Sequence, residues 1–292
     1  MKTQTVFMVR PRAFGFNPET APSNAFQFSG GMKDAAHLAR AEFDAVVSTL
    51  NQAGIQTLVW EEPPGLQRPD SVFPNNWFSS HPKGKLFLYP MLSPLRQQEV
   101  DPTIIHFLQE HYGPLAIHDW RQNTSRFLEG RGSLVFDHRL KRAYLARSPR
   151  SDGSLAQKVC AELQYKLIAF SAQDQKGQAI YHTNVLLSIG TDWALVCADA
   201  VAPSDRERIL SHLSEKRELH FIDHSQMNRF AANILELDQR VLALSETARE
   251  ALGSEGAAFF KKQNLQLVSA AIPTIEKLGG GSLRCMLAEL FW

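Results

Sequence analysis

The sequence predicts an α/β fold in which five repeated units are arranged radially, as in a propeller. Two strand-like runs, an amphipathic helix and a third strand-like run recur roughly every 50 to 60 residues. No low-complexity tract or long linker separates these units. The chain is 44% hydrophobic and 21% charged, which is ordinary for a globular protein. Because radial repetition leaves only short, protected strand edges, we expect one catalytic domain over residues 1–292.

The first unit shows how each segment is predicted. An apolar strand over residues 5–9 ends at a proline, and a polar loop follows. Apolar residues near a 3.6-residue period then predict a helix over residues 32–53. Gly54 ends this helix, and residues 55–60 form the next expected strand.

The remaining four units repeat this order with different sequences. Their strand, strand, helix and strand segments are expected at residues 71–78, 85–89, 97–111 and 114–120; 126–136, 143–146, 154–163 and 166–170; 179–187, 193–197, 205–213 and 218–222; and 233–237, 240–244, 245–260 and 265–268. A final apolar run at residues 286–292 follows three successive glycines. This run predicts a last strand that returns to complete the first unit.

Composition and charge exclude several functional classes. The net charge is +1, so no global field favours binding to nucleic acid or to an anionic membrane. No apolar run reaches the roughly 18 residues of a membrane span, and residues 1–5 lack the hydrophobic region of a signal peptide. The three cysteines are widely spaced, which argues against a disulfide framework or structural zinc. We therefore expect a cytoplasmic protein, and whether it forms a homodimer stays open.

Three residues have the types required for cysteine-dependent catalysis. Cys285 offers a thiol nucleophile, His182 a proton-transfer base and Glu129 a carboxylate partner. The non-catalytic interpretations are that Cys285 and His182 are ordinary core residues and that Glu129 is a turn residue. Glu129 and His182 are each expected in the first strand of their unit, as are the asparagines at 75, 76 and 184, and Cys285 directly precedes the returning strand. This shared position in the repeat favours a common site, with the polar members Asn75, Asn76, Glu129, His182, Asn184 and Cys285.

The sequence lacks the motifs of other site types. No histidine has metal-ligand spacing with a carboxylate or a cysteine, so no metal is expected. Gly130 and Gly132 do not form a dinucleotide fingerprint, and the glycines at 279–281 lack the lysine of a phosphate-binding loop. A Gly-x-Ser-x-Gly nucleophile elbow is also missing. We therefore expect no cofactor.

Several short motifs, taken together and in order, resemble those of the guanidine-modifying, or amidinotransferase, superfamily. This superfamily includes arginine deiminases, dimethylarginine dimethylaminohydrolases and amidinotransferases. The motifs that carry the resemblance are Asp70-x-x-Phe73-x-x-Asn76, Glu129-Gly130, His182-x-Asn184 and the glycine-rich turn before Cys285. Longer strings, Val72-Phe73-Pro74-Asn75-Asn76-Trp77 among them, look like the bacterial citrulline utilisation hydrolases, or citrulline ureidases. The resemblance implies a five-bladed α/β propeller of pseudo-symmetric ββαβ modules.

The resemblance also implies roles for the candidate residues. Cys285 would attack the central carbon of a guanidino or ureido group. His182 would protonate the leaving amine and then activate water, and Glu129 would hold the substrate nitrogens. Substrate contacts are further expected from Asn75, Asn76, Asn184 and Asp70. No metal or organic cofactor is implied.

Departures from the arginine deiminase pattern point to a neutral substrate. Asn76 and Asn184 stand where those enzymes have aspartates. A guanidinium offers only donors and a positive charge, which suits carboxylates, whereas a ureido group is neutral and has a carbonyl acceptor. Buried carboxylates beside a neutral ligand would lose their hydration without gaining a partner. The expected reaction is therefore hydrolysis of citrulline to ornithine, ammonia and carbon dioxide.

Two points stay open. An arginine is expected to bind the substrate α-carboxylate, and the candidates are Arg10, Arg126, Arg131 and Arg284. Of these, Arg126 and Arg284 are included among the expected substrate-binding residues. The alternatives to citrulline hydrolysis are hydrolysis of a guanidine, as in dimethylarginine hydrolysis or arginine deimination, and a non-catalytic propeller that binds an amino acid.

Overall fold

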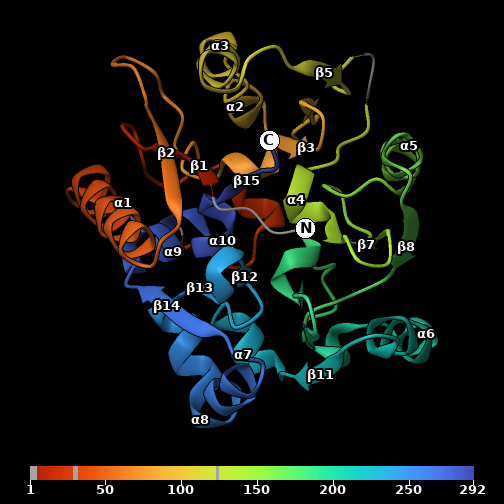
Figure 1. Ribbon diagram of the computed structural model, residues 1–292. Helices are drawn as coiled ribbons and strands as arrows, with labels where there is room; N and C mark the ends of the chain where they lie inside the picture. Colours follow the sequence, from red (N-terminus) through yellow and green to blue (C-terminus); the bar gives the residue numbers. More distant parts are fainter. Residues whose placement is uncertain (1–4, 29–31, 123–124) are drawn as a thin grey trace.

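The computed structural model describes residues 5–28, 32–122 and 125–292, so residues 1–4, on which the expectation of no signal peptide partly rests, lie outside the described residues. Five modules surround a central axis, with the long helices at the periphery and short helical turns near the centre (Figure 1). Each module contains one three-stranded sheet. The expected five-bladed α/β propeller is thus confirmed. No helix in these ranges is both long and apolar enough to cross a membrane.

Each module follows the order strand, strand, helix, strand. The modules consist of β15 (Ala288–Leu290), β1 (Thr5–Arg10), α1 (Ala35–Gln52) and β2 (Gln56–Glu61); β3 (Phe78–His81), β4 (Lys85–Leu88), α2 (Pro94–Gln97), α3 (Pro102–Tyr112) and β5 (Ala116–Asp119); β6 (Val135–Asp137), β7 (Arg142–Ala146), α5 (Gly153–Leu163) and β8 (Lys166–Phe170); β9 (Leu187–Ile189), β10 (Trp193–Val196), α6 (Pro203–Ser214) and β11 (Glu218–Phe221); and β12 (Leu235–Glu236), β13 (Val241–Ser245), α8 (Glu246–Lys262) and β14 (Gln266–Ala270).

The sheet topology is the same in all five modules. The first two strands pair antiparallel, and the helix then crosses back so that the third strand lies parallel to the second. In the first module the antiparallel partner comes from the far end of the chain, because Phe7 of β1 lies opposite Ala288 of β15. The prediction of a returning last strand is therefore confirmed. Pairing of the two chain ends closes the ring.

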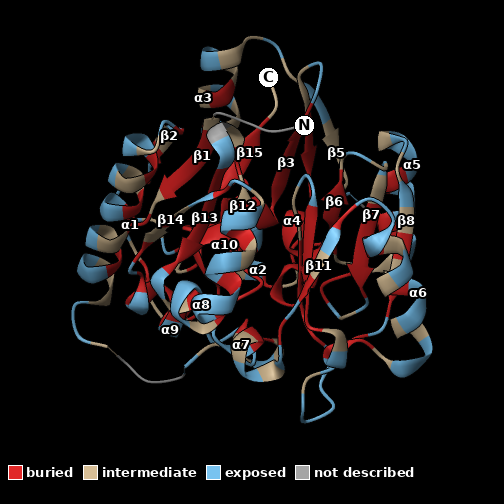
Figure 2. Cartoon of the chain, turned by 60° about the horizontal axis from the view of Figure 1, so that its bottom comes forward, coloured by how far each residue is buried: buried red, intermediate tan, exposed pale blue. Residues whose placement is uncertain are grey.

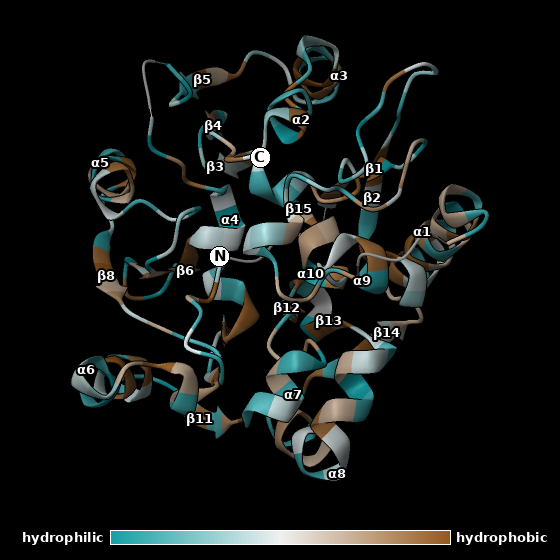
Figure 3. Ribbon diagram, turned by 180° about the vertical axis from the view of Figure 1, so that it is seen from behind, coloured by the Kyte–Doolittle hydropathy of each residue, from teal (hydrophilic) through white to brown (hydrophobic). Residues whose placement is uncertain are grey.

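The outer helices bury one face each. On α1 the buried residues are Ala39, Phe43, Val46 and Leu50, at the spacing of one helical face. Figure 2 shows buried strands inside a shell of helices whose outer sides are exposed. The helices carry both hydrophilic and hydrophobic residues (Figure 3). Burial of these stripes, rather than helix propensity alone, holds the helices against the sheets.

The first strands of the modules are shorter than the sequence predicts. Residues 71–78 and 179–187 were both expected to be strands, and that expectation is wrong. Residues Pro74–Asn76 and Thr183–Val185 form single 3₁₀ turns, η2 and η3, and strands start only afterwards. Pro74 at the first position of η2 lacks an amide hydrogen and has a fixed φ, which suits a turn better than a sheet ladder.

Similar turns precede two other inner strands. These are α4 (Gly130–Ser133) before β6 and α10 (Leu283–Met286) before β15. The turn α4 contacts both η2 and η3, and α10 contacts η2. The turns therefore meet around the axis, and their backbone bends direct polar side chains toward the centre.

A buried ion pair joins the third and fourth modules. The guanidinium of Arg217, just before β11, donates two hydrogen bonds of 2.7 and 2.8 Å to the carboxylate of Asp137 at the end of β6. Both side chains are almost fully buried. Removal of one partner from such a pair strongly destabilises the fold, because the charge left behind stays desolvated.

We expect Arg217→Met to lower the free energy of unfolding by about 3–5 kcal/mol, since it leaves Asp137 buried without a counter-charge. The double variant Arg217→Met/Asp137→Leu removes both charges and should recover most of that loss. Urea unfolding of the three proteins measures the difference. Equal destabilisation by the single and double variants would contradict this account.

Candidate active site

Polar side chains from all five modules converge at the turns around the axis. Asn76 belongs to η2, and Glu129 is the residue before α4. His182 directly precedes η3, and Cys285 lies in α10. The fifth module contributes Asn233, two residues before β12. All five side chains are buried, with exposed fractions between 0 and 4%.

His182 and Glu129 form a buried pair. Nε2 of His182 lies 2.7 Å from Oε2 of Glu129, and a guanidinium nitrogen of Arg150 lies 3.5 Å from the same oxygen. Burial alone would raise the pKa of Glu129, but Arg150 and His182 outweigh it and hold the pKa well below its usual range. Burial lowers the pKa of His182, with Glu129 opposing that shift. The carboxylate is therefore ionised and the imidazole neutral at neutral pH.

These charge states determine which imidazole nitrogen is basic. An ionised carboxylate only accepts hydrogen bonds, so Nε2 of His182 carries the proton and donates it to Glu129. Nδ1 is then the nitrogen with a free lone pair. This atom lies against Gly132, where a Cβ would come within 2.6 Å of Nδ1 and 2.7 Å of the Asn76 amide nitrogen. Glycine at position 132 thus permits the approach of His182 and Asn76 to α4.

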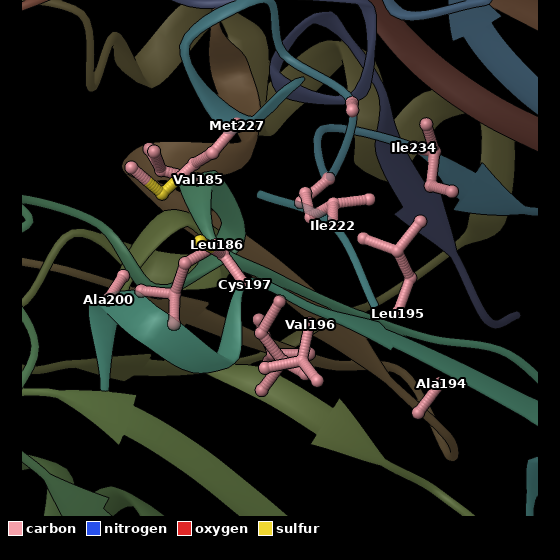
Figure 4. Close-up of a cluster of buried hydrophobic side chains, with 14 of the residues drawn as sticks. Val185, Leu186, Ala194, Leu195, Val196, Cys197, Ala200, Ile222, Met227 and Ile234 are labelled. Carbon is pink, nitrogen blue, oxygen red and sulfur yellow. The ribbon is translucent and has the colours of Figure 1, made fainter. Parts of the chain in front are cut away.

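Two carboxamides contact the sulfur of Cys285. Nδ2 of Asn233 lies 3.3 Å from Sγ, and Nδ2 of Asn184 lies 3.6 Å from it. Oδ1 of Asn184 has no hydrogen-bond partner within the described part of the chain. Both asparagines are anchored by apolar neighbours, since Val185 and Ile234 belong to a buried hydrophobic cluster (Figure 4). Asn184 therefore contributes a fixed amide donor to the sulfur.

A small cavity lies in front of Cys285. Cys285, His182 and Asn76 share its wall, whereas Asn184 does not reach it. Its volume of about 10 Å³ is close to that of one water site. The lining residues are Thr20, Asn24, Asp70, Phe73, Asn76, Arg96, Arg150, Tyr181, His182, Gly279, Gly280, Gly281 and Cys285.

Part of the cavity wall is the loop between β1 and α1. Nδ2 of Asn24 in this loop approaches the carbonyl oxygens of Gly279 and Gly280, and Arg150 donates to the carbonyl of Thr20. Gly280 has a φ of +62°, and a Cβ there would come within 2.5 Å of Asn24. The loop therefore packs directly on the glycine turn. An amino acid does not fit a cavity of this size unless the loop moves.

Several residues expected to bind substrate lie elsewhere, and those expectations need correction. Arg284 turns away from the cavity, and its guanidinium donates to Ser188 and to main-chain carbonyls. Arg126 is exposed and donates to Ser154. Asn75 does not line the cavity, because it donates to the carbonyl of Arg284 and accepts from Asn76.

The other two arginine candidates also lie away from the cavity. Arg131 pairs with Glu289, and Arg10 pairs with Asp44 and Glu61 near the rim. None of the four arginines named from the sequence is among the cavity-lining residues. Their side chains brace modules or pair at the surface instead.

Two arginines that the sequence analysis missed line the cavity instead. Arg96 of α2 pairs with Glu99 at 2.8 and 3.0 Å and donates to Oδ1 of Asn76 at 2.8 Å. Arg150 lies over the ring of Tyr181 and contacts Glu129. Both follow the middle strands of their modules, β4 and β7, and lie outside any recognised motif. Asn233, by contrast, occupies the repeat position of Asn76 and Asn184, so the periodicity could have indicated it.

Asp70 supplies the negative charge of the cavity wall. Its Oδ2 accepts from Asn17 at 2.7 Å and lies 3.9 Å from Arg96, while Oδ1 has no hydrogen-bond partner among the described residues. Burial raises the pKa of Asp70, and Arg96 and Asn17 oppose that shift. Among the described residues, no three His, Cys, Asp or Glu side chains are grouped so that they could hold a metal ion.

The family model for eukaryotic N,N-dimethylarginine dimethylhydrolases matches residues 10–292. The chain belongs to this family. It is accordingly a hydrolase of the guanidine-modifying superfamily, whose members act on carbon–nitrogen bonds. No curated protein matches this chain.

Solved structures share the fold at low sequence identity. The N-terminal domain of ArgZ, a cyanobacterial arginine dihydrolase, covalently bound to a reaction intermediate, superposes with a TM-score of 0.79 at 14% identity, over 98% of this chain and 97% of that one. This chain spans 40% of intact ArgZ. A dimethylarginine dimethylaminohydrolase with an S-methyl-L-thiocitrulline adduct gives a TM-score of 0.72 at 11% identity, over 99% and 100% of the two chains.

We expect Gly132→Ala to lower kcat by on the order of a hundredfold or more, because its methyl group would displace His182 and Asn76 from reacting positions. Steady-state kinetics with whichever substrate the wild type hydrolyses would measure this loss. Gly153→Ala is the matched control, since a Cβ there meets only Leu145 at 4.0 Å. Full activity of the Gly132 variant would show that the turn tolerates the methyl group.

Proposed function

We propose that this protein, acting as one catalytic domain, hydrolyses the ureido group of citrulline to ornithine, ammonia and carbon dioxide, with Cys285 as nucleophile. The observation that carries this proposal is the neutrality of the polar groups beside the thiol. Asn184 and Asn233 contact the sulfur and Asn76 shares the cavity wall with it, whereas Glu129 is paired with His182 and Asp70 lies 3.9 Å from Arg96.

Charge balance supports a neutral reacting group. The cavity wall contains two arginines and one aspartate, and His182 is neutral. Glu129 is already matched by Arg150 and by its bond to His182. Arg96 is likewise matched by Glu99, so a guanidinium placed near Cys285 would meet carboxamides, while Glu99 and Glu129 are already paired with arginines. A ureido group would meet donors for its carbonyl and acceptors for its amide hydrogens without a desolvated charge.

The charged groups of the wall suit the two ends of an α-amino acid. The free Oδ1 of Asp70 can accept from an α-ammonium. Arg96 and Arg150 can bind an α-carboxylate, because both present guanidinium groups to the cavity. We assign carboxylate binding to these two arginines, in place of Arg126 and Arg284.

The proposed reaction proceeds through a covalent intermediate. The Cys285 sulfur attacks the ureido carbon as the thiol proton passes to the imidazole of His182. The bond from this carbon to the ornithine nitrogen breaks, and His182 returns the proton to the leaving amine. Water then loses a proton to His182 and attacks the carbamoyl thioester. The sulfur–carbon bond breaks, His182 returns the proton to the sulfur, and carbamic acid decomposes to ammonia and carbon dioxide. Departure of ammonia before ornithine yields the same products.

The family match favours a second candidate function. The family model is named for N,N-dimethylarginine hydrolysis, and the same nucleophile and histidine could release dimethylamine from that substrate. The two candidates differ in the charge of the reacting group. Product analysis therefore separates them.

We expect purified protein to release ornithine and ammonia from citrulline, and to act at least tenfold more slowly on arginine, N,N-dimethylarginine and agmatine. A chromatographic assay of amino-acid products over the panel makes the comparison. Cys285→Ser should abolish turnover, whereas Cys160→Ser should not, since Cys160 is buried in another module. Turnover of a guanidine without turnover of citrulline would refute the substrate assignment.

Binding of the α-carboxylate can be tested with a substrate that lacks it. We expect Arg150→Gln to lower kcat/KM for citrulline by roughly a hundredfold, through loss of a charge-assisted hydrogen bond in a buried site. For N-carbamoylputrescine, which has the ureido group but no carboxylate, the variant and the wild type should differ much less. Equal losses on both substrates would indicate general damage to Glu129 and His182 and would contradict the assignment.

A further inference from the structure

The carboxamide of Asn233 is devoted to the Cys285 sulfur. Its Nδ2 lies 3.3 Å from Sγ and its Oδ1 lies 3.7 Å from it. Within the described part of the chain, these are the hydrogen bonds of this side chain. The residue is 2% exposed, so water does not offer alternative partners. The polar atoms of this buried carboxamide therefore have the Cys285 sulfur as their hydrogen-bond partner.

The backbone holds Asn233 in this position. Phe230, three residues earlier, is a bulky residue in the left-handed region with a φ of +60°. The amide of Asn233 donates to the Phe230 carbonyl at 2.8 Å, which closes the turn. Ile234 on the other side packs into the buried cluster of Figure 4. The strained turn and the apolar anchor leave the carboxamide little freedom to move away from the sulfur.

One carboxamide can serve both protonation states of the thiol. A neutral thiol donates weakly to Oδ1, and a thiolate accepts from the Nδ2 group. A hydrogen bond to the charged form favours that form. Asn184 provides a second donor at 3.6 Å. His182 is bonded to Glu129, so within the described residues the hydrogen bonds to the sulfur come from these two amides.

We propose that Asn233 is a catalytic residue of this site, whose carboxamide holds the Cys285 sulfur and stabilises the thiolate that attacks the substrate carbon. This inference rests on the proposed role of Cys285 as nucleophile, and it is independent of whether the substrate is ureido or guanidino. It explains how a sulfur in contact with neutral carboxamides can still carry a charge.

The test measures ionisation of Cys285 without substrate. Ultraviolet absorbance of the thiolate is followed against pH, and the same titration of a matching Cys285→Ser protein is subtracted. This subtraction removes the absorbance of the tyrosines and of the two other cysteines. The backgrounds are wild type, Asn233→Asp, Asn233→Ala and the control Asn264→Asp, which makes the same chemical change on an exposed turn after α8.

We expect the midpoint of thiolate formation to rise by about one pH unit or more in Asn233→Ala, and further in Asn233→Asp, which places an anion beside the sulfur. Asn264→Asp should titrate as wild type does. The charged and titratable groups around the sulfur are the same in wild type and in Asn233→Ala, so a shift between these two reports the carboxamide. These groups are Asp70, Arg96, Glu129, Arg150, Tyr181, His182 and Arg284.

The outcomes separate catalysis from structure. Unchanged midpoints in both Asn233 variants, or lower activity with unchanged midpoints, would overturn the proposal, because a merely structural role does not alter thiol ionisation. If Asn233→Asp does not fold, judged by thermal unfolding, Asn233→Ala decides. A raised midpoint in a protein that does not hydrolyse citrulline would sustain the role of Asn233 and refute the proposed substrate.

Discussion

The pairing of the two chain ends is the constraint on which the site depends. β15 is only three residues long, and it lies antiparallel to β1 directly after the turn that contains Cys285. Without this pairing the first module would lack its inner strand, and α10 would have no fixed position beside η2. Ring closure therefore does more than cover a sheet edge. It places Cys285, the proposed nucleophile, against histidine, glutamate and asparagine from three other modules.

The sequence predicted the repeat well and the site partly. Apolar periodicity located the outer helices, because each has one buried face, and continuous apolar runs located strands such as β10 and β13, which are buried at every position. The inner strands were overestimated because residues 71–78 and 179–187 are apolar on either side of their polar members. Periodicity cannot distinguish a buried strand from a turn of 3₁₀ helix followed by a short strand. The same turns expose the polar side chains to the axis, so the error and the site coincide.

The positions of the arginines relative to the cavity could not be predicted from the sequence. Arg284 lies beside Cys285 in sequence, yet successive residues of a helical turn point in different directions, and its side chain leaves the axis for Ser188. Arg96 and Arg150 lie far from every motif and reach the cavity only through the arrangement of their modules. Asn233 is the intermediate case. Its place in the repeat matches that of Asn76, although its contact with sulfur appears only in three dimensions.

The proposed function requires this site to stabilise a thiolate without creating a pocket for cations. An ion pair with histidine would achieve the first aim, but His182 is committed to Glu129. Carboxylates near the sulfur would attract a guanidinium and also oppose ionisation of the thiol. Carboxamides avoid both effects, because they donate to an anion and carry no charge. Under the proposed function, neutral amides from two modules would serve both the reactivity of Cys285 and selectivity for a neutral substrate.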